Sequence, residues 1–379
     1  MKICLKLSAV VLTLLTAVTV LTQSAGAVSA SAKAYVVINA ETGEVLVSSN
    51  AHLRLSMAST TKIMTALILA EQNTHEKEIT ATKEMVTVEG SSMGLLPGDK
   101  VSYYELLIGM LLPSGNDAAN TAAICVAGST EKFADLMNRR AAEIGMTNTH
   151  FVTPSGLDDK EHYTTAYDMS LLAAEALKNE TIRDIVSKES ITVTFGNPPY
   201  KRTLYNHNKL LGLYEYCIGV KTGFTKKSGR CLVSAAEKDG CRVIAVTLND
   251  PNDWNDHCGL LDYGLSKLSL KDVTADIKLD ALPVVGGKDD TVSVSLPRYL
   301  CGCTDATQSG ITAEVSAVPF VYAPVNCGQT VGYVNYCYNG KIIHTSEIIA
   351  LRSVECVEYK PGFFERFKKQ INNLFMFFI

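Results

Sequence analysis

The stretch Ser56–Ala66 reads SMASTTKIMTA and places a serine three residues before a lysine, at Ser59 and Lys62. The polar run gives way there to an apolar pattern that predicts a helix from Thr60 to about Gln72. Residues three apart on a helix share a face, so the lysine amine can reach the serine hydroxyl. Two interpretations fit this stretch alone. Ser59 either caps a helix beside a solvated lysine, or is a nucleophile whose base lies one turn away.

The bulk composition is that of a globular protein with room for two domains. The chain has 379 residues, 47% of them hydrophobic and 20% charged. A net charge of −4 provides no basic surface, so no nucleic-acid partner is expected. The pair Cys301 and Cys303 lacks the C-x-x-C spacing of a zinc or redox site, so we expect no metal and no cofactor. The other cysteines could form disulfides or lie buried in reduced form, and the sequence leaves both alternatives open.

The first 27 residues have the pattern of an export signal. MKICLK carries two lysines, an uncharged apolar run follows over Leu7–Thr22, and QSAGA supplies small residues at Ala25 and Ala27. This order predicts a signal peptide over residues 1–27 and an exported protein. A transmembrane anchor is the alternative, but the run is short for a membrane span and ends in a cleavage pattern.

The rest of the chain divides into two domains by its patterning. Residues 33–268 begin with the strand-like runs AYVVIN and EVLVSS, continue through a helical middle, and end with IGVKTGF, RCLVSAA and CRVIAVTL. Short turns join the last three runs, which predicts an antiparallel meander that the first two strands extend. The expected fold is α/β (α+β), a five-stranded antiparallel sheet flanked by helices. Residues 272–356 hold strand-like runs without a convincing helix and predict a small all-β domain.

The last segment, residues 361–379, predicts an amphipathic helix. PG is followed by FFERFKKQINNLFMFFI, in which apolar residues recur at helical spacing beside basic ones. Such a helix is too short and too charged to span a bilayer but fits its interface, so we expect a peripheral membrane protein. A helix that docks on the protein's own surface is the alternative.

Two later motifs bear on Ser59. PSGNDAAN (Pro113–Asn120) reads as an S-x-N motif on a tight turn between predicted helices, although it also fits a plain turn. VKTGFT (Val220–Thr225) places K-T-G on a predicted strand, where a cation and a hydroxyl can hold a carboxylate. A glycine there lets a ligand lie close to the strand. S-x-x-K, S-x-N and K-T-G together, in this order, are the signature of penicillin-binding proteins and class A β-lactamases.

The sequence resembles the low-molecular-mass penicillin-binding proteins, which are serine-type D-alanyl-D-alanine carboxypeptidases that trim the peptide stem of peptidoglycan. Further stretches are similar to that family: FVTPSGLDD, TTAYDM after His162, NHNKLL and LLDYGL in the first domain and APVNCGQTVG in the second. S-G-N in place of S-D-N, the all-β domain with its terminal helix and the lack of an E-x-x-L-N element favour this family over class A β-lactamases. The resemblance covers essentially the whole exported chain and implies a penicillin-binding-protein/β-lactamase-like fold for the first domain.

The resemblance implies a role for each motif residue. Ser59 would be the nucleophile, Lys62 its general base, and Ser114 a relay that carries a proton to the leaving nitrogen. The backbone N–H groups of Ser59 and Phe224 would form the oxyanion hole. The residues implied in substrate binding are Asn116, Lys221, Thr222, Gly223, Phe224 and Thr225. The partners would be a peptidoglycan stem peptide ending in D-Ala-D-Ala, β-lactam antibiotics as inhibitors, and the outer face of the cytoplasmic membrane.

One region departs from the family. Some members place an arginine after the strands that follow K-T-G, where it helps to bind the terminal carboxylate, but Asn249–Cys258 contains no arginine or lysine. His257 is interpreted as a surface histidine. Carboxylate binding is therefore expected to rest on Lys221, Thr222 and Thr225. D,D-endopeptidase activity, β-lactamase activity and a non-catalytic peptidoglycan-binding role stay open as alternatives, although the intact motifs argue against the last.

Overall fold

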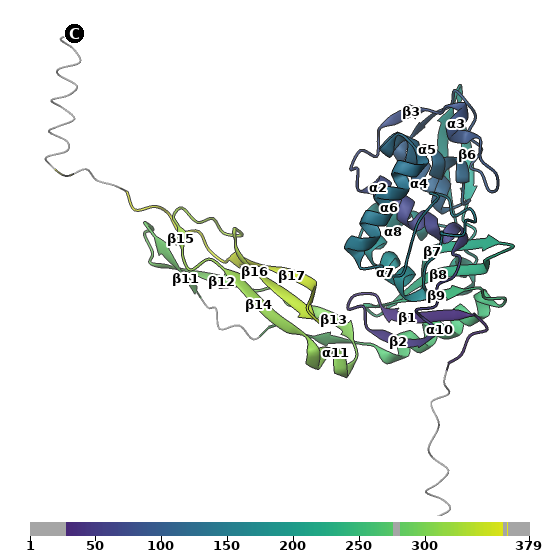
Figure 1. Cartoon of the computed structure of the whole chain (residues 1–379). Coiled ribbons are helices and arrows are strands. Elements are labelled where there is room, and N and C mark those ends of the chain that lie inside the picture. Colours follow the sequence, from purple (N-terminus) through teal and green to yellow (C-terminus); the bar gives the residue numbers. More distant parts are fainter. Residues whose placement is uncertain (1–27, 276–280, 359–361, 363–379) are drawn as a thin grey trace, which may run out of the picture. The chain divides into compact units, whose positions relative to one another are not determined.

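The computed structural model describes residues 28–275, 281–358 and 362 of the chain (Figure 1). The expected signal peptide lies outside the described residues, and so does the expected C-terminal helix apart from Gly362. The chain divides into two compact units between Ser269 and Leu270. Within the described residues, no helix is both long and apolar enough to cross a membrane.

The first unit is built on a five-stranded sheet in which neighbouring strands run antiparallel. The strand order is β2-β1-β9-β8-β7, so the N-terminal hairpin extends the C-terminal meander. This arrangement confirms the predicted fold class and the five-stranded sheet. The strands are β1 (Ala34–Asn39), β2 (Val45–Ser49), β7 (Cys217–Thr225), β8 (Gly229–Lys238) and β9 (Cys241–Leu248).

Helices cover both faces of this sheet (Figure 1). Successive strand residues point to opposite faces, and both faces are apolar here. On one face Val36 and Val246 join the large core of the helical middle. On the other face Val37 and Val243 pack with Leu260 of α10 (Asp253–Lys267). The helical middle contains η1 (Ala58–Thr61), α2 (Lys62–Ala70), α3 (Lys83–Val86), α4 (Tyr103–Leu111), α5 (Asn116–Ala127), α6 (Thr130–Ile144), α7 (Ala166–Ala176), α8 (Glu180–Val186) and α9 (Leu210–Leu213).

A capping box fixes the start of α4, the helix that leads into the S-x-N turn. The Ser102 hydroxyl accepts a hydrogen bond from the Glu105 N–H, and the Glu105 carboxylate accepts one from the Ser102 N–H. These two bonds satisfy backbone donors that the first helical turn leaves free. The capping box therefore fixes the first turn of the helix that leads to Ser114.

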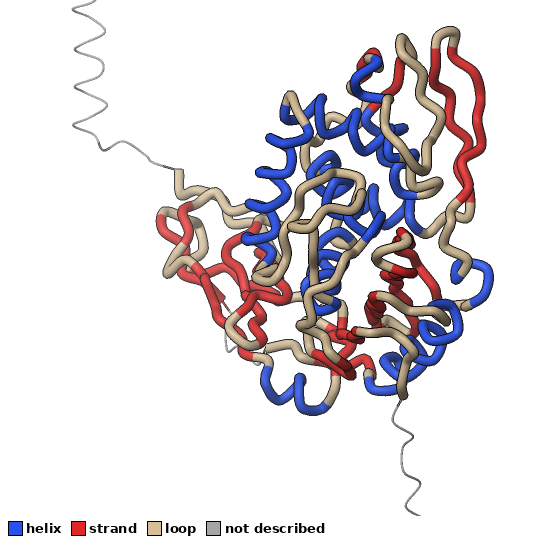
Figure 2. Tube along the Cα trace, turned by 45° about the vertical axis from the view of Figure 1, so that its right-hand side comes forward, coloured by secondary structure: helices blue, strands red, loops and turns tan. Residues whose placement is uncertain are grey.

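Two hairpins and four helices of this unit were not predicted. The hairpins pair β3 (Glu78–Thr80) with β4 (Lys100–Ser102) and β5 (Ser190–Gly196) with β6 (Pro199–Tyr205). The second hairpin projects as two long strands at the top of Figure 2. The helices are α3, α8, α9 and α10, and α10 begins inside the polar run Asn249–Cys258, which reads as a loop when taken alone.

The second unit is a β domain, as predicted. Its main sheet has six strands in the order β14-β16-β17-β12-β11-β15, and β10 pairs with β13 beside it. The strands β11 and β15 run parallel to each other. The expectation of no helix was wrong at one place, because α11 (Asp305–Gly310) forms a short helix capped by Thr304. The strands are β10 (Ser269–Asp272), β11 (Ala281–Val285), β12 (Thr291–Ser295), β13 (Leu300–Cys303), β14 (Thr312–Ala317), β15 (Val321–Tyr322), β16 (Thr330–Tyr338) and β17 (Lys341–Ala350).

Candidate active site

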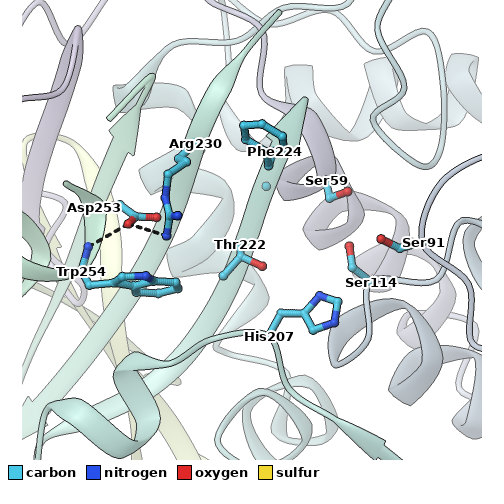
Figure 3. A pocket seen from close by; sticks show the side chains of 10 residues that line it. Ser59, Ser91, Ser114, His207, Thr222, Phe224, Arg230, Asp253 and Trp254 are labelled. Carbon is cyan, nitrogen blue, oxygen red and sulfur yellow. Dashed lines mark hydrogen bonds and ion pairs between the residues drawn. The ribbon is translucent and has the colours of Figure 1, made fainter. Parts of the chain in front are cut away.

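The three sequence motifs meet at one cavity of ≈ 380 Å³ beside β7 (Figure 3). Ser59 comes from η1, Ser114 from the turn before α5, and Thr222 from β7. Five residues outside the motifs also line the cavity: Ser91, His207, Arg230, Asp253 and Trp254. The fold therefore brings together segments that lie more than a hundred residues apart in the sequence.

The first motif places a buried amine on the nucleophile candidate. Lys62 Nζ lies 2.9 Å from Ser59 Oγ and donates to the Ser155 carbonyl at 2.7 Å. Burial, and then the charge of Lys221, hold the pKa of Lys62 well below its ordinary value, while Asp117 acts in the opposite direction. A lowered pKa increases the fraction of an amine that is neutral at a given pH. Lys62 can therefore accept the proton of the Ser59 hydroxyl.

Backbone contacts fix the position of the nucleophile candidate. Ala58, the residue before it, has a φ of 48°, a left-handed conformation that is uncommon outside glycine. The strand β7 approaches the same segment so closely that a Cβ on Gly223 would lie 3.1 Å from the Ser59 nitrogen. A residue larger than glycine would separate β7 from η1. The K-T-G glycine therefore lets β7 lie against the Ser59 backbone.

A buried histidine supports the same segment. His162 Nδ1 accepts a hydrogen bond from the Val152 N–H, so the neutral ring carries its proton on Nε2, 2.8 Å from the Thr61 hydroxyl. The Thr61 hydroxyl in turn donates to the Ala58 carbonyl. Burial lowers the pKa of His162 to about 4, so the ring is neutral near pH 7. His162 thus orients η1 and lies outside the set of residues that line the cavity.

The S-x-N turn presents two polar atoms without protein partners. Ser114 has a φ of 64° and its Oγ is buried. Neither this oxygen nor Asn116 Oδ1 has a hydrogen-bond partner among the described residues. Asn116 Nδ2 donates to the Glu89 carbonyl at 2.6 Å, so Asn116 holds the segment next to Ser91. Buried polar atoms usually find partners, and two orphans at one cavity are available to a ligand.

Asp117 was not singled out from the sequence, yet it organises the wall of the cavity. Its carboxylate accepts hydrogen bonds from the Ser92 hydroxyl and from the N–H groups of Met93, Gly94 and Leu95. Four donors to one buried carboxylate fix the path of this loop, which carries Ser91 into the cavity. The sequence holds a weak signal for it, since Asp117 directly follows the S-x-N motif.

On β7 the motif side chains divide between the cavity and the interior. Thr222 and the exposed Phe224 line the cavity, whereas Lys221 is buried and donates to the Thr222 carbonyl at 2.9 Å. Burial lowers the pKa of Lys221 to about 7. Thr225 is not among the lining residues, and its hydroxyl bonds to the Asp158 carboxylate at 3.0 Å. Thr225 therefore ties the end of β7 to the neighbouring loop.

The interpretation of His257 as a surface residue was wrong. Its side chain is 0% exposed and lies between the hydroxyls of Ser234 and Thr247, on the face of the sheet that α10 covers. Burial lowers the pKa of His257 to about 3, so the ring is neutral at physiological pH. His257 therefore cannot supply a cation to the site.

A cation reaches the cavity from a different strand. Arg230 on β8 pairs with Phe224 of β7, makes a 2.8 Å ion pair with Asp253, and lies over the Trp254 ring (Figure 3). Sequence reasoning missed Arg230 because only the residues after the last strand were considered as a source of a cation. The closeness of Arg230 to K-T-G comes from the pairing of β8 with β7. Aligning VKTGFT with RCLVSAA across the turn between them would have placed Arg230 next to K-T-G.

Comparison with known proteins identifies the family. A family model described as D-alanyl-D-alanine carboxypeptidase matches residues 20–252, and one described as the C-terminal domain of penicillin-binding protein 5 matches residues 271–356. The D-alanyl-D-alanine carboxypeptidase DacF of Bacillus subtilis is 30% identical over 353 residues, which cover 90% of each chain. DacC of Escherichia coli, with the same enzyme name, is 33% identical over 91% of this chain and 88% of its own.

Solved structures have the same fold. Penicillin-binding protein 5 from Haemophilus influenzae has a TM-score of 0.62 at 26% identity, over 86% of this chain and 98% of its own. A Streptomyces DD-transpeptidase has a TM-score of 0.60 at 32% identity and covers 63% of this chain and 98% of its own. These matches confirm the resemblance found in the motifs. The chain belongs to the D-alanyl-D-alanine carboxypeptidase family of low-molecular-mass penicillin-binding proteins.

Proposed function

We propose that this protein is a serine-type D-alanyl-D-alanine carboxypeptidase that removes the terminal D-alanine of peptidoglycan stem peptides through an acyl-enzyme on Ser59. One observation carries the proposal. The amine of Lys62, whose pKa burial lowers, lies 2.9 Å from Ser59 Oγ at the edge of a cavity that Ser114 and Thr222 also line. A serine becomes a nucleophile at neutral pH when such a base is adjacent.

The reaction has two steps, acylation of Ser59 and hydrolysis of the acyl-enzyme. Ser59 Oγ attacks the carbonyl carbon between the two D-alanines while Lys62 takes the hydroxyl proton. The N–H groups of Ser59 and Phe224 hold the developing oxyanion, and fixed donors of this kind contribute about 3 kcal/mol each. The carbon–nitrogen bond then breaks, and Ser114 relays the proton held by Lys62 to the nitrogen of the departing D-alanine, which leaves Lys62 neutral again. Water attacks the acyl-enzyme, regenerates Ser59 and releases the shortened peptide.

The other motif residues hold the substrate. The unpartnered oxygen of Asn116 accepts from a substrate N–H, and the Thr222 hydroxyl donates to the terminal carboxylate. Lys221 assists Ser114 electrostatically, Gly223 leaves room for the peptide along β7, and Thr225 acts indirectly by fixing the end of the strand. Penicillins present a strained amide and a carboxylate in a similar arrangement, so they acylate Ser59 as inhibitors.

D-alanine release tests the proposal directly. The exported chain is given diacetyl-L-Lys-D-Ala-D-Ala, with Ser59→Ala as the matched variant. Release that the substitution abolishes identifies both the reaction and the nucleophile. A folded protein that is labelled by penicillin without releasing D-alanine would move the substrate to cross-linked peptides. Absence of both release and labelling would make the chain a peptidoglycan-binding protein.

We also propose that the protein is exported, loses residues 1–27, and lies on the outer face of the cytoplasmic membrane through residues 361–379. The supporting observations are the signal-like pattern at the N-terminus and the apolar and basic residues of the last segment. A chain that ends at residue 360 should release D-alanine as the full chain does but remain in the supernatant after membranes are sedimented. Sedimentation of the shortened chain with membranes would contradict the anchor.

A further inference from the structure

The cavity has a polar wall that the proposed chemistry leaves unused. In Figure 3 this wall lies across Thr222 from Ser59 and Ser114 and consists of Arg230, Asp253 and Trp254. Opposite residues of an antiparallel pair project from the same face of a sheet, and Arg230 lies opposite Phe224. Arg230 is thus the diagonal neighbour of Thr222, a spacing that a long side chain can bridge.

The start of α10 holds the Arg230 guanidinium in place. The Asp253 side chain is 5% exposed, accepts a hydrogen bond from the Trp254 N–H at 2.9 Å, and pairs with Arg230 Nη2 at 2.8 Å. The guanidinium carbon lies 5.3 Å from the centre of the Trp254 ring. An ion pair on one edge and an aromatic face beside it restrict the orientation of the guanidinium.

The pairing with Asp253 leaves Arg230 with unused donors. A guanidinium presents five N–H donors, and the ion pair engages Nη2. Arg230 Nε has no partner among the described residues, and the side chain as a whole is 42% exposed. Asp253 is the one carboxylate among the described residues that line the cavity, and it is already paired. A substrate carboxylate that enters the cavity can therefore approach Arg230, because the carboxylate of Asp253 is already engaged and no unpaired carboxylate of the described residues lines the cavity to repel it.

The order of groups along the cavity matches the end of a D-Ala-D-Ala peptide. With the scissile carbonyl at Ser59 and the terminal carboxylate at Thr222, that carboxylate lies on the side of the cavity where Arg230 lies. We infer that Arg230 is a specificity-determining residue that selects substrates whose leaving residue carries a free carboxylate, with Asp253 and Trp254 as its positioning residues. This inference rests on the proposed function.

The test compares two substrates that differ only in this charge. Diacetyl-L-Lys-D-Ala-D-Ala and its C-terminal carboxamide are given to the exported chain at pH 7, and release of D-alanine or D-alaninamide is followed by mass spectrometry. A charged hydrogen bond corresponds to a factor of about 10 to 100 in kcat/KM, which is the expected preference of the wild type for the acid. Arg230→Gln should lose that factor for the acid and change the amide rate by less than about threefold.

Three further variants separate recognition from a structural role. Arg230→Lys keeps the charge without the planar fork, so its acid-to-amide ratio should fall between those of the wild type and Arg230→Gln. Asp253→Asn keeps the guanidinium but weakens the contact that orients it, so its ratio should also fall below the wild-type ratio. Arg242→Gln breaks the ion pair of β9 with Glu237, away from the cavity, and should leave the ratio unchanged.

The outcomes that overturn the inference are distinct from failure of the proposed function. Equal losses on acid and amide in Arg230→Gln would show that Arg230 only stabilises the fold. A wild type that does not discriminate between the two substrates would also overturn the inference while leaving the carboxypeptidase intact. A wild type that releases neither product would overturn the proposed function and the inference with it. If thermal denaturation shows that Arg230→Gln is unfolded, Arg230→Lys and Asp253→Asn carry the same comparison.

Discussion

At the scale of single residues, the site depends on two lysines buried within one region of the fold. Lys62 is 0% exposed and Lys221 is 1% exposed. Burial is the largest cause of the lowered pKa of each, and the charge of Lys221 lowers the pKa of Lys62 further. The two amines therefore do not titrate independently, and the pH dependence of acylation reports on both.

This coupling predicts the effect of Lys221→Gln. Acylation of Ser59 requires neutral Lys62, so its rate falls as the pH drops through the pKa of Lys62. Removing the charge of Lys221 removes a cause that lowers this pKa, so the pKa of Lys62 rises. The acid limb of penicillin acylation should then move to higher pH, and the rate near pH 6 should drop about tenfold or more. Stopped-flow measurements between pH 5 and pH 10 test this, and an unmoved limb would contradict it.

Burial of His257 predicts a loss of stability in acid. Its pKa is about 3 in the folded protein and 6.5 ordinarily, so between these pH values the unfolded chain binds a proton that the folded chain does not. Stability due to this group is therefore present above pH 6.5 and declines as the pH falls toward 3. The free energy of unfolding should drop by about 3 kcal/mol between pH 7 and pH 4.5 through His257 alone.

The matched variant for this effect is His257→Gln, which is less stable at pH 7 but has no ring to protonate. Urea denaturation at the two pH values should give a gap between wild type and variant that narrows in acid. A gap of constant size would contradict the assignment, because His162, the other histidine with a strongly lowered pKa, is present in both proteins.

Residue-level predictions from the sequence succeeded where the contact is local. The spacing of Ser59 and Lys62 predicts their contact, since both lie within one turn. His257 was misread because it lies in a polar stretch of sequence. Its burial depends on how α10, the helix that carries it, packs on the sheet. Arg230 was missed for the same reason, since its place in the cavity follows from the register of β7 and β8. A single sequence does not encode such long-range pairings in its periodicity.

At the scale of elements, the site is held by loops packed against η1. The loop that contains Gly156 is one of them, and its backbone has a φ of 87° there. A Cβ on Gly156 would lie 1.9 Å from the Ala58 carbonyl oxygen and 2.8 Å from the Thr61 hydroxyl. Both atoms belong to the segment that carries Ser59, so the position leaves no room for a side chain.

Gly156→Ala should therefore displace η1 and reduce D-alanine release by about 100-fold or more, because misplacement of reacting groups by about 1 Å has effects of that size. Gly145→Ala is the control. Gly145 has a φ of 90° at the end of α6, and nothing lies within 4 Å of the added Cβ. The control should lose about 1 kcal/mol of stability from backbone strain and keep its activity. Equal activity of the two variants would contradict the packing argument.

The elements themselves could be predicted to the extent that each carries its own signal. Ser102 and Glu105 mark the start of α4, and short, nearly continuous apolar runs mark β1, β8 and β9. The helix α10 begins with DWNDH, whose polar residues give no apolar stripe, and its burial comes from Leu260 and Leu261 further along. The hairpin of β5 and β6 has mostly exposed residues and therefore a weak pattern.

At the scale of the whole molecule, the change in patterning near Leu270 coincides with the division between the two compact units. The strand order of the second unit was beyond sequence reasoning, because β15 pairs with β11 across a long stretch of chain. The hairpin of β16 and β17 is the exception. Its turn, Asn339–Gly340, has positive φ at both residues, as the Asn-Gly dipeptide favours.

This division predicts that the first unit folds and works alone. All residues that line the cavity lie before Ser269, and the Streptomyces DD-transpeptidase, of similar fold, matches only 63% of this chain while 98% of its own length is covered. A chain of residues 28–269 buries its own core and needs no contact from the second unit to complete the site. Its kcat/KM for D-alanine release should lie within about threefold of the value for residues 28–360.

The measurement compares the two chains on diacetyl-L-Lys-D-Ala-D-Ala, with thermal unfolding followed by circular dichroism. The longer chain should show a transition at the temperature at which residues 28–269 unfold, because each unit has a hydrophobic core of its own. If residues 28–269 are folded yet lose more than about tenfold in kcat/KM, the second unit contributes to the activity of the site and the prediction is wrong.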